Sequence, residues 1–136
     1  MTELRDRLLA EARAALKQSY SPYSSFPVGA ALLDEEGGVH RGTNVENASL
    51  GLTICAERVA VFRAVADGHP RFRAIAIVTP TAEPTAPCGA CRQVLLEFAD
   101  PDFIVWLAGE GEEVEEHRLE DLIPRAFGSF RPKEGS

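Results

Sequence analysis

The chain has 136 residues, of which 45% are hydrophobic and 26% are charged, so the composition predicts one soluble globular domain and excludes intrinsic disorder or two independent cores. Acidic residues outnumber basic ones by 21 to 14, and the net charge of −7 argues against a nucleic acid or an anionic membrane as partner. We find neither a secretion signal nor the ~18 consecutive apolar residues of a membrane span, and therefore expect a cytoplasmic protein.

The first third of the chain predicts a helix followed by a hairpin. Leucine and alanine recur at intervals of three and four over residues 3–17, which indicates an amphipathic helix with Thr2 as its N-cap. A loop rich in serine, proline and aromatic residues covers 19–27. Two short strands, over 28–33 and 39–45, flank an acidic turn with two glycines and form the hairpin.

Helices and strands then alternate along the rest of the chain. The pattern predicts a helix, a buried central strand, a helix, a strand, an acidic solvated turn and a short helix over residues 55–66, 74–79, 88–98, 103–107, 109–116 and 119–123. On the first of these helices we expect one shared face to hold Val59, Phe62, Arg63 and Ala66. The order predicts a three-layer α/β domain over residues 1–128, with helices on both faces of one sheet and a frayed tail at 129–136.

The three cysteines lie in two clusters, each at a point where a loop enters a helix. Cys55 precedes the first of these helices, and Cys88 and Cys91 lie one helical turn apart at the start of the next. A helix N-terminus stabilises a thiolate. Three thiolates around Zn²⁺ leave a fourth coordination position open, which is typical of a catalytic zinc.

Two other interpretations of the cysteines remain open from the residues alone. A thioredoxin-type redox pair would need only a Cys-x-x-Cys motif after a strand. A structural zinc would need a fourth protein ligand, but none of the three histidines is near a cysteine cluster in the sequence, and we expect all three at the surface: His40, His69 and His117.

Glu57 favours the catalytic interpretation. It lies two residues after Cys55, where its carboxylate would face the open position and could move a proton between a water and a leaving group. The simpler role for this residue is to complement the helix dipole.

Together these residues resemble a known family. Cys55-Ala56-Glu57-Arg58 with Pro87-Cys88-Gly89-Ala90-Cys91-Arg92-Gln93 is similar to the zinc-dependent cytidine deaminases, in their small homotetrameric, three-cysteine type. The resemblance extends over about residues 4–127 and implies a three-layer α-β-α fold with a mixed central sheet. Further matching segments lie at 22–26, 28–32, 42–48 and 122–127.

The resemblance implies hydrolytic deamination of cytidine and deoxycytidine to uridine and deoxyuridine plus ammonia, as in pyrimidine salvage. Cys55, Cys88 and Cys91 would bind Zn²⁺, which activates a water. Glu57 would carry a proton from that water to N3 of the pyrimidine and then to the leaving amino group. The residues expected to bind the substrate are Phe26, Asn44, Glu46, Ala56 and Phe127.

Further expectations follow from comparison with the family's pattern. Three thiolates leave Zn²⁺ with a net charge of −1, and Arg58 matches an arginine that offsets this charge in three-cysteine members. Phe127 would reach the site of a neighbouring subunit, so we expect a homotetramer whose sites are completed by neighbours. Leu50 and Ala86 depart from the pattern, which has an aromatic residue and a serine in many members at these positions.

Three competing functions are weighed against the nucleoside deaminase. A polynucleotide deaminase of the same superfamily is disfavoured by the charge of −7. A deaminase of a nucleoside antibiotic such as blasticidin is disfavoured by Asn44 and Glu46, which together suit an unmodified ribose. A non-catalytic zinc module would have no use for Glu57, so a Glu57→Gln variant separates it from an enzyme.

Overall fold

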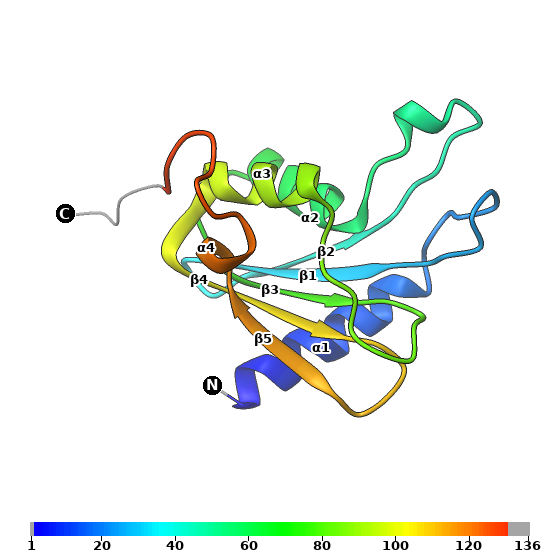
Figure 1. The fold of residues 1–136 in the computed structure, drawn as a ribbon, viewed down its shortest axis with the longest axis horizontal. Helices are drawn as coiled ribbons and strands as arrows, with labels where there is room; N and C mark the ends of the chain where they lie inside the picture. The colour runs from blue at the N-terminus through cyan, green and yellow to red at the C-terminus, as the bar shows by residue number, and fades with distance from the viewer. Residues whose placement is uncertain (1, 131–136) are drawn as a thin grey trace.

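The computed structural model describes residues 2–130 and contains one five-stranded sheet with helices on both faces (Figure 1). In chain order the elements are α1 (Thr2–Leu16), β1 (Gly29–Asp34), β2 (Val39–Thr43), the 3₁₀ helix η1 (Leu50–Leu52), α2 (Ala56–Ala66), β3 (Phe72–Val78), α3 (Gly89–Phe98), β4 (Ala99–Ala108), β5 (Val114–Arg118) and α4 (Leu119–Leu122). Within the described residues no helix is both long and apolar enough to cross a membrane.

The sheet is mixed, as expected. Its strand order is β2-β1-β3-β4-β5, in which β3 and β4 run parallel and every other neighbouring pair is antiparallel. The parallel pair is joined through α3, because parallel neighbours need a crossover connection. The strand predicted to be central is β3, and it lies in the middle of the sheet. The three-layer fold class predicted from the sequence is confirmed.

The two faces of β3 supply the two halves of the core. Successive strand residues point to opposite faces. Ile75 and Ile77 pack with α2 and α3 on one face, whereas Ala74 and Ala76 pack with α1 on the other. Figure 1 shows α1 crossing one face of the sheet while α2, α3 and α4 cover the opposite face. The three cysteines lie on the α2 and α3 side.

The face of α2 that packs on the sheet is not the one that holds Val59, Phe62, Arg63 and Ala66. The side chains that α2 buries against the sheet are small, namely Ala56, Ala60, Val61 and Ala64, together with the carboxylate of Glu57. Phe62 is 49% exposed, and Arg63 is also exposed. The small alanine side chains allow α2 to lie close to the sheet.

The predicted acidic turn at residues 109–116 is only partly correct. Its last three residues belong to β5, an edge strand that pairs antiparallel with β4. Glu116 faces the buried Trp106 across this pair, and its carboxylate accepts a hydrogen bond from the indole nitrogen at 2.8 Å. The signal for a strand was hidden because an edge strand with charged side chains lacks the apolar alternation of a buried one.

The histidines lie away from the cysteines, as expected, but His40 is not a simple surface residue. It lies on β2 with only 12% of its side chain exposed, and its ring Nε2 is 2.7 Å from the buried carboxylate of Asp34. His69, in the loop after α2, approaches the same carboxylate at 3.5 Å. These contacts tie the β1–β2 turn to the loop between α2 and β3.

At the two ends of the chain the structure refines the predicted boundaries. Thr2 is already part of α1 rather than its N-cap. Phe130 packs against the core on the α2 and α3 side of the sheet. The remainder of the predicted tail, residues 131–136, lies outside the described residues, and the domain boundary at 128 stays a prediction.

Candidate metal and nucleoside site

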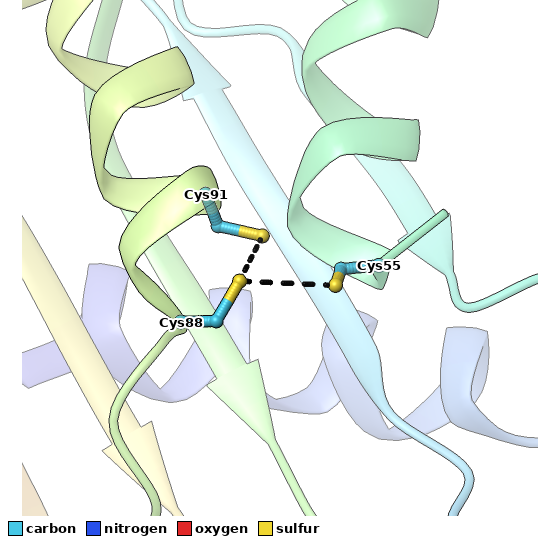
Figure 2. A group of neighbouring side chains, drawn as sticks. All are labelled: Cys55, Cys88 and Cys91. Carbon is cyan, nitrogen blue, oxygen red and sulfur yellow. Dashed lines mark hydrogen bonds between the residues drawn. The ribbon is translucent and has the colours of Figure 1, made fainter. Parts of the chain in front are cut away.

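Three thiols from two helix N-termini converge on one point (Figure 2). Cys55 is the N-cap of α2, Cys88 is the N-cap of α3, and Cys91 lies in the first turn of α3. Their sulfurs all lie within 4.8 Å of one another, with Cys55 to Cys88 at 3.9 Å and Cys88 to Cys91 at 3.3 Å. Thiolates bound tetrahedrally at ~2.3 Å from zinc are about 3.8 Å apart, so this donor set fits Zn²⁺.

The surroundings of Cys55 favour its thiolate form. The hydrogen bond from Cys91 lowers the pKa of Cys55 to about 5, although burial opposes the shift, and Arg58 lowers this pKa further. Proton sharing with Cys55 raises the pKa of Cys91. A guanidinium nitrogen of Arg58 donates to the Cys55 sulfur at 3.5 Å. A cation that replaces the shared proton would leave every thiol of the cluster ionised.

Arg58 meets the expectation that an arginine lies beside the sulfurs. Its Nε is fully buried and has no hydrogen-bond partner among the described residues. The guanidinium is therefore held against the thiol cluster by its neighbours rather than exposed on the surface of α2. Its positive charge lies where it can offset the charge of the thiolates.

Glu57 is the buried acid of the site. It lies in the first turn of α2, only 5% exposed, and lines the same pocket as Cys55. Burial raises the pKa of Glu57 to about 7, and the negative charge of Cys55 adds to the rise. A carboxyl group with a pKa near neutrality can both accept and release a proton under physiological conditions, which suits a general acid and base.

A pocket of about 320 Å³ opens beside the thiols. This volume lies at the lower end of the range typical for small-molecule sites. The predicted residues Phe26, Asn44, Glu46 and Ala56 line the pocket together with Glu57. Sequence reasoning missed the remaining lining residues, which surround the predicted ones: Ser24, Val28, Thr53, Ile77, Thr79 and Thr85.

The side chain of Asn44 anchors the loop that carries Phe26. Its Oδ1 accepts hydrogen bonds from the Ser19 hydroxyl at 2.5 Å and from the Val28 amide at 2.9 Å. Its Nδ2 donates to the Phe26 carbonyl at 2.8 Å. An amide nitrogen carries two protons, so Asn44 retains one donor for another partner.

Glu46 binds the same loop two residues further along the chain. Its Oε1 accepts hydrogen bonds from the amides of Tyr23 and Ser24, at 2.9 and 3.1 Å, and its Oε2 accepts one from the Ser24 hydroxyl. The hydrogen bond from the Ser24 hydroxyl lowers the pKa of Glu46. Burial acts in the opposite direction but is the smaller effect, so the pKa lies below its usual value. Glu46 is therefore an ionised acceptor at neutral pH.

Phe127 does not enter the pocket of its own chain. Its side chain is 88% exposed, while its carbonyl accepts a hydrogen bond from Gln93 at 2.9 Å. Next to Gln93, Arg92 donates to the Pro87 carbonyl at 2.8 Å and to the Leu122 carbonyl at 2.7 Å. The start of α3 thus holds the C-terminal segment in place and presents Phe127 outward.

The two departures from the family's pattern lie in different surroundings. Leu50 is on η1 and 71% exposed, away from the sheet. Ala86 lines the pocket itself, two residues before Cys88. A serine at position 86 would therefore add a hydroxyl to the pocket wall.

Comparison with known proteins now identifies the family. The model of the cytidine and deoxycytidylate deaminase zinc-binding region matches residues 2–107. The chain belongs to this family. A cytidine deaminase from Sporosarcina psychrophila is 48% identical over 122 residues, which cover 90% of each chain.

Solved structures of the family have the same fold. The cytidine deaminase from Burkholderia pseudomallei is 48% identical, with a TM-score of 0.87 over 90% of this chain and 98% of that one. The enzyme from Mycobacterium tuberculosis is 41% identical, with a TM-score of 0.79 over 90% of this chain and 96% of that one. Since the family model is a zinc-binding region, zinc is the metal that the thiol cluster is placed to hold.

Proposed function

We propose that this protein hydrolyses cytidine and deoxycytidine to uridine and deoxyuridine, with release of ammonia. The observation that carries the proposal is a buried carboxylate, Glu57, in one pocket with a thiol cluster that fits zinc. Relatives named cytidine deaminase, at 43–48% identity over about nine tenths of this chain, support the substrate class. Nucleosides released from nucleic acids would then be recovered for pyrimidine salvage.

Glu57 would move the protons of the reaction. Water attacks C4 of the base, and the carboxylate of Glu57 accepts a proton from that water. Glu57 passes this proton to N3, then takes the second proton of the water from the new C4 hydroxyl and delivers it to the leaving amino group, so that one water is consumed and one ammonia leaves. A pKa of about 7 for Glu57 allows both directions of transfer near neutral pH.

The zinc ion, when bound by Cys55, Cys88 and Cys91, would supply acidity by lowering the pKa of a coordinated water. Arg58 would keep the thiolates from donating all of their charge to the metal, because its guanidinium hydrogen-bonds the Cys55 sulfur. The first amides of a helix have no intrahelical partner. The backbone amide of Ala56 would therefore be available to hold the carbonyl oxygen of the base.

The hydrogen-bonding capacities of Asn44 and Glu46 support opposite roles at the sugar. Asn44 has used both acceptor sites of its Oδ1 on the loop and retains a donor, so it would donate to a ribose hydroxyl. Glu46 is an acceptor, so it would accept from a ribose hydroxyl. Phe26 would pack against the base or sugar from its place in the pocket wall.

A direct assay tests the proposed reaction. Zinc-loaded protein is incubated with cytidine, deoxycytidine, adenosine and single-stranded DNA, and ammonia release is measured together with the loss of cytosine absorbance. We expect turnover of the two cytosine nucleosides only. Glu57→Gln should retain zinc and lose at least about a thousandfold in kcat, within the range for removal of a general acid and base.

Glu97→Gln provides the matched control, because Glu97 is an exposed glutamate on α3. It should be as active as the wild type. Folded protein with one zinc per chain that releases no ammonia from cytidine would overturn the proposal. Full activity in Glu57→Gln would be consistent with the proposed reaction but would show that Glu57 does not transfer its protons.

We also propose a homotetramer in which Phe127 completes the pocket of a neighbouring subunit. A phenylalanine that is 88% exposed and held by its backbone is suited to insert into a partner. Other large apolar side chains are also exposed in the single chain: Tyr20, Tyr23, Val45, Leu50, Leu52, Phe62 and Val65. Such exposure is costly in water and favours burial between subunits.

Mass measurement and subunit mixing test the assembly. Light scattering should give about four times the chain mass of 14.8 kDa. Phe127→Ala and Glu57→Gln should each be weakly active alone, and a mixture refolded together should recover activity, because some pockets then combine an intact Glu57 with an intact Phe127 from a neighbour. A monomer with full activity would refute the assembly.

A cytoplasmic location and a single domain ending near residue 128 complete the proposal. The three cysteines are free thiols, and reduced thiols persist in the reducing cytoplasm. Fractionation of cells that express the tagged protein tests the location. Removal of residues 131–136, with thermal unfolding of the shortened chain, tests the boundary, and a large loss of stability would contradict it.

A further inference from the structure

The hydroxyl of Ser24 connects two parts of the pocket, the Glu46 carboxylate and the backbone of Phe26. It donates a hydrogen bond to Oε2 of Glu46 and accepts one from the backbone amide of Phe26 at 3.0 Å. A serine hydroxyl has a single proton to donate, and here that proton is committed to the carboxylate. One side chain therefore links the acceptor at the sugar end of the pocket to the backbone of its aromatic wall.

The remaining capacity of Glu46 shows what this link controls. A carboxylate offers about four acceptor positions, and the loop fills three of them, two on Oε1 and one on Oε2. The remaining position is the second lone pair of Oε2. Its direction depends on how the carboxylate is rotated, and the Ser24 hydroxyl is the contact that fixes Oε2.

We propose that Ser24 is a positioning residue that sets the specificity of the pocket for a sugar hydroxyl. It acts through Glu46, by orienting the free lone pair of Oε2 towards the hydroxyl of a bound nucleoside. Its hydrogen bond with the Phe26 amide also fixes the backbone that carries the aromatic side chain, and so the distance between that ring and the sugar of a bound nucleoside. This inference rests on the proposed nucleoside deaminase function.

The position of Ser24 in the fold predicts a particular kinetic signature. Ser24 lies in the loop between α1 and β1, whereas the thiols and Glu57 lie at the N-termini of α2 and α3. Loss of the Ser24 hydroxyl should therefore weaken substrate binding and leave the chemical step nearly unchanged. We expect Ser24→Ala to raise KM about tenfold, equivalent to about 1.4 kcal/mol, with kcat within about twofold of the wild type.

The experiment compares three substrates that differ in one hydroxyl each: cytidine, 2′-deoxycytidine and 3′-deoxycytidine. If Ser24 acts through a sugar hydroxyl, Ser24→Ala and the wild type should have about the same KM for the analogue that lacks the hydroxyl bound by Glu46. This is a double-mutant cycle between a side chain and a substrate group. Ser24→Thr retains the hydroxyl and should restore the wild-type KM.

Ser49→Ala is the matched control. Ser49 is an exposed serine before η1 whose side chain makes no capping hydrogen bond, so its KM should equal that of the wild type. An equal penalty for all three substrates in Ser24→Ala would show a general loop effect and overturn the proposal. A fall in kcat at constant KM would overturn it as well.

Product binding separates this inference from the proposed reaction. Calorimetry with uridine, 2′-deoxyuridine and 3′-deoxyuridine measures Kd without turnover, and the same pattern of penalties is expected for Ser24→Ala. Selective loss of binding in a protein that releases no ammonia would support the role of Ser24 and refute the proposed activity. Failure of the wild type to bind uridine would refute both.

Discussion

Gly42 on β2 offers the sharpest test of how the sheet positions the site. A Cβ added at this glycine would lie 2.2 Å from the carbonyl oxygen of Ala56, 2.5 Å from the amide nitrogen of Ala60 and 2.8 Å from its Cβ. Ordinary contacts between heavy atoms lie at about 3.5–4.0 Å. In Gly42→Ala the first turns of α2 would therefore have to withdraw from the sheet by more than about 1 Å.

The displacement should lower the free energy of unfolding. Overpacking of a well-packed core costs about 1–3 kcal/mol, and two of the three close contacts at Gly42 are backbone atoms that cannot rotate away. We therefore expect a loss of about 3 kcal/mol in the free energy of unfolding, which lowers Tm by roughly 10 °C in a domain of this size. Since Ala56 follows Cys55, the shift should also move one thiol away from the other two.

Thermal unfolding followed by circular dichroism measures the stability, and competition with a chelator measures the zinc affinity. Gly29→Ala is the informative companion, because its Cβ would lie 1.9 Å from the carbonyl oxygen of Ala12 on α1, across the sheet from the thiols. It should lose stability without weakening zinc binding. Gly51→Ala meets nothing within 4 Å and should resemble the wild type. A Gly42→Ala protein with wild-type Tm and zinc affinity would refute the argument.

Three further predictions concern charged groups. Burial raises the pKa of Asp34, but hydrogen bonds from His40 and two turn amides outweigh it, so the pKa lies below its usual value. The wild type should therefore be more stable than Asp34→Asn by a constant amount above about pH 5. Denaturant unfolding should show this difference shrinking as the pH falls from about 4 through the lower folded pKa. An advantage independent of pH would contradict this. Arg58→Gln should keep one zinc per chain and lower kcat about tenfold, because a ligand thiolate loses its charged hydrogen-bond partner; unchanged kcat at full zinc occupancy would be inconsistent with this role. Arg92→Ala removes two hydrogen bonds to carbonyls, one of them in the residue before Cys88, and should lose about 2 kcal/mol of stability and release zinc faster to a chelator. Equal release rates in a destabilised protein would limit Arg92 to a structural role.

The zinc cluster could be predicted from sequence because its elements are local. Cys88 and Cys91 are one helical turn apart, and a helix brings such a pair to one side whatever the rest of the fold does. Cys55 and Glu57 are likewise held by one helix N-terminus. No local rule shows that the two helix starts converge; the sequence makes this possible, and the fold brings the three sulfurs together.

The packed face of α2 and the strand β5 could not be predicted in the same way. α2 packs through alanines because β2 approaches it closely at Gly42, and hydrophobicity does not distinguish such an alanine from an exposed one. β5 is the last strand of the sheet, and only one of its edges is hydrogen-bonded to a neighbour, β4. Such an edge strand can carry charged side chains, so its strand character depends on pairing with β4. Both features result from neighbours that are distant in sequence.

The three cysteines show most clearly where sequence ends and tertiary structure begins. Their number, their place before helices and the acid beside Cys55 favoured a catalytic zinc over a redox pair or a structural zinc, since each follows from residue chemistry and helix geometry. Only the folded chain shows that Asn44, Glu46 and Ser24 share their hydrogen-bonding groups between the loop and the pocket. Donor and acceptor capacity at a site is set by every group that reaches it, and those groups come together only when the sheet, the helices and the loop are in place.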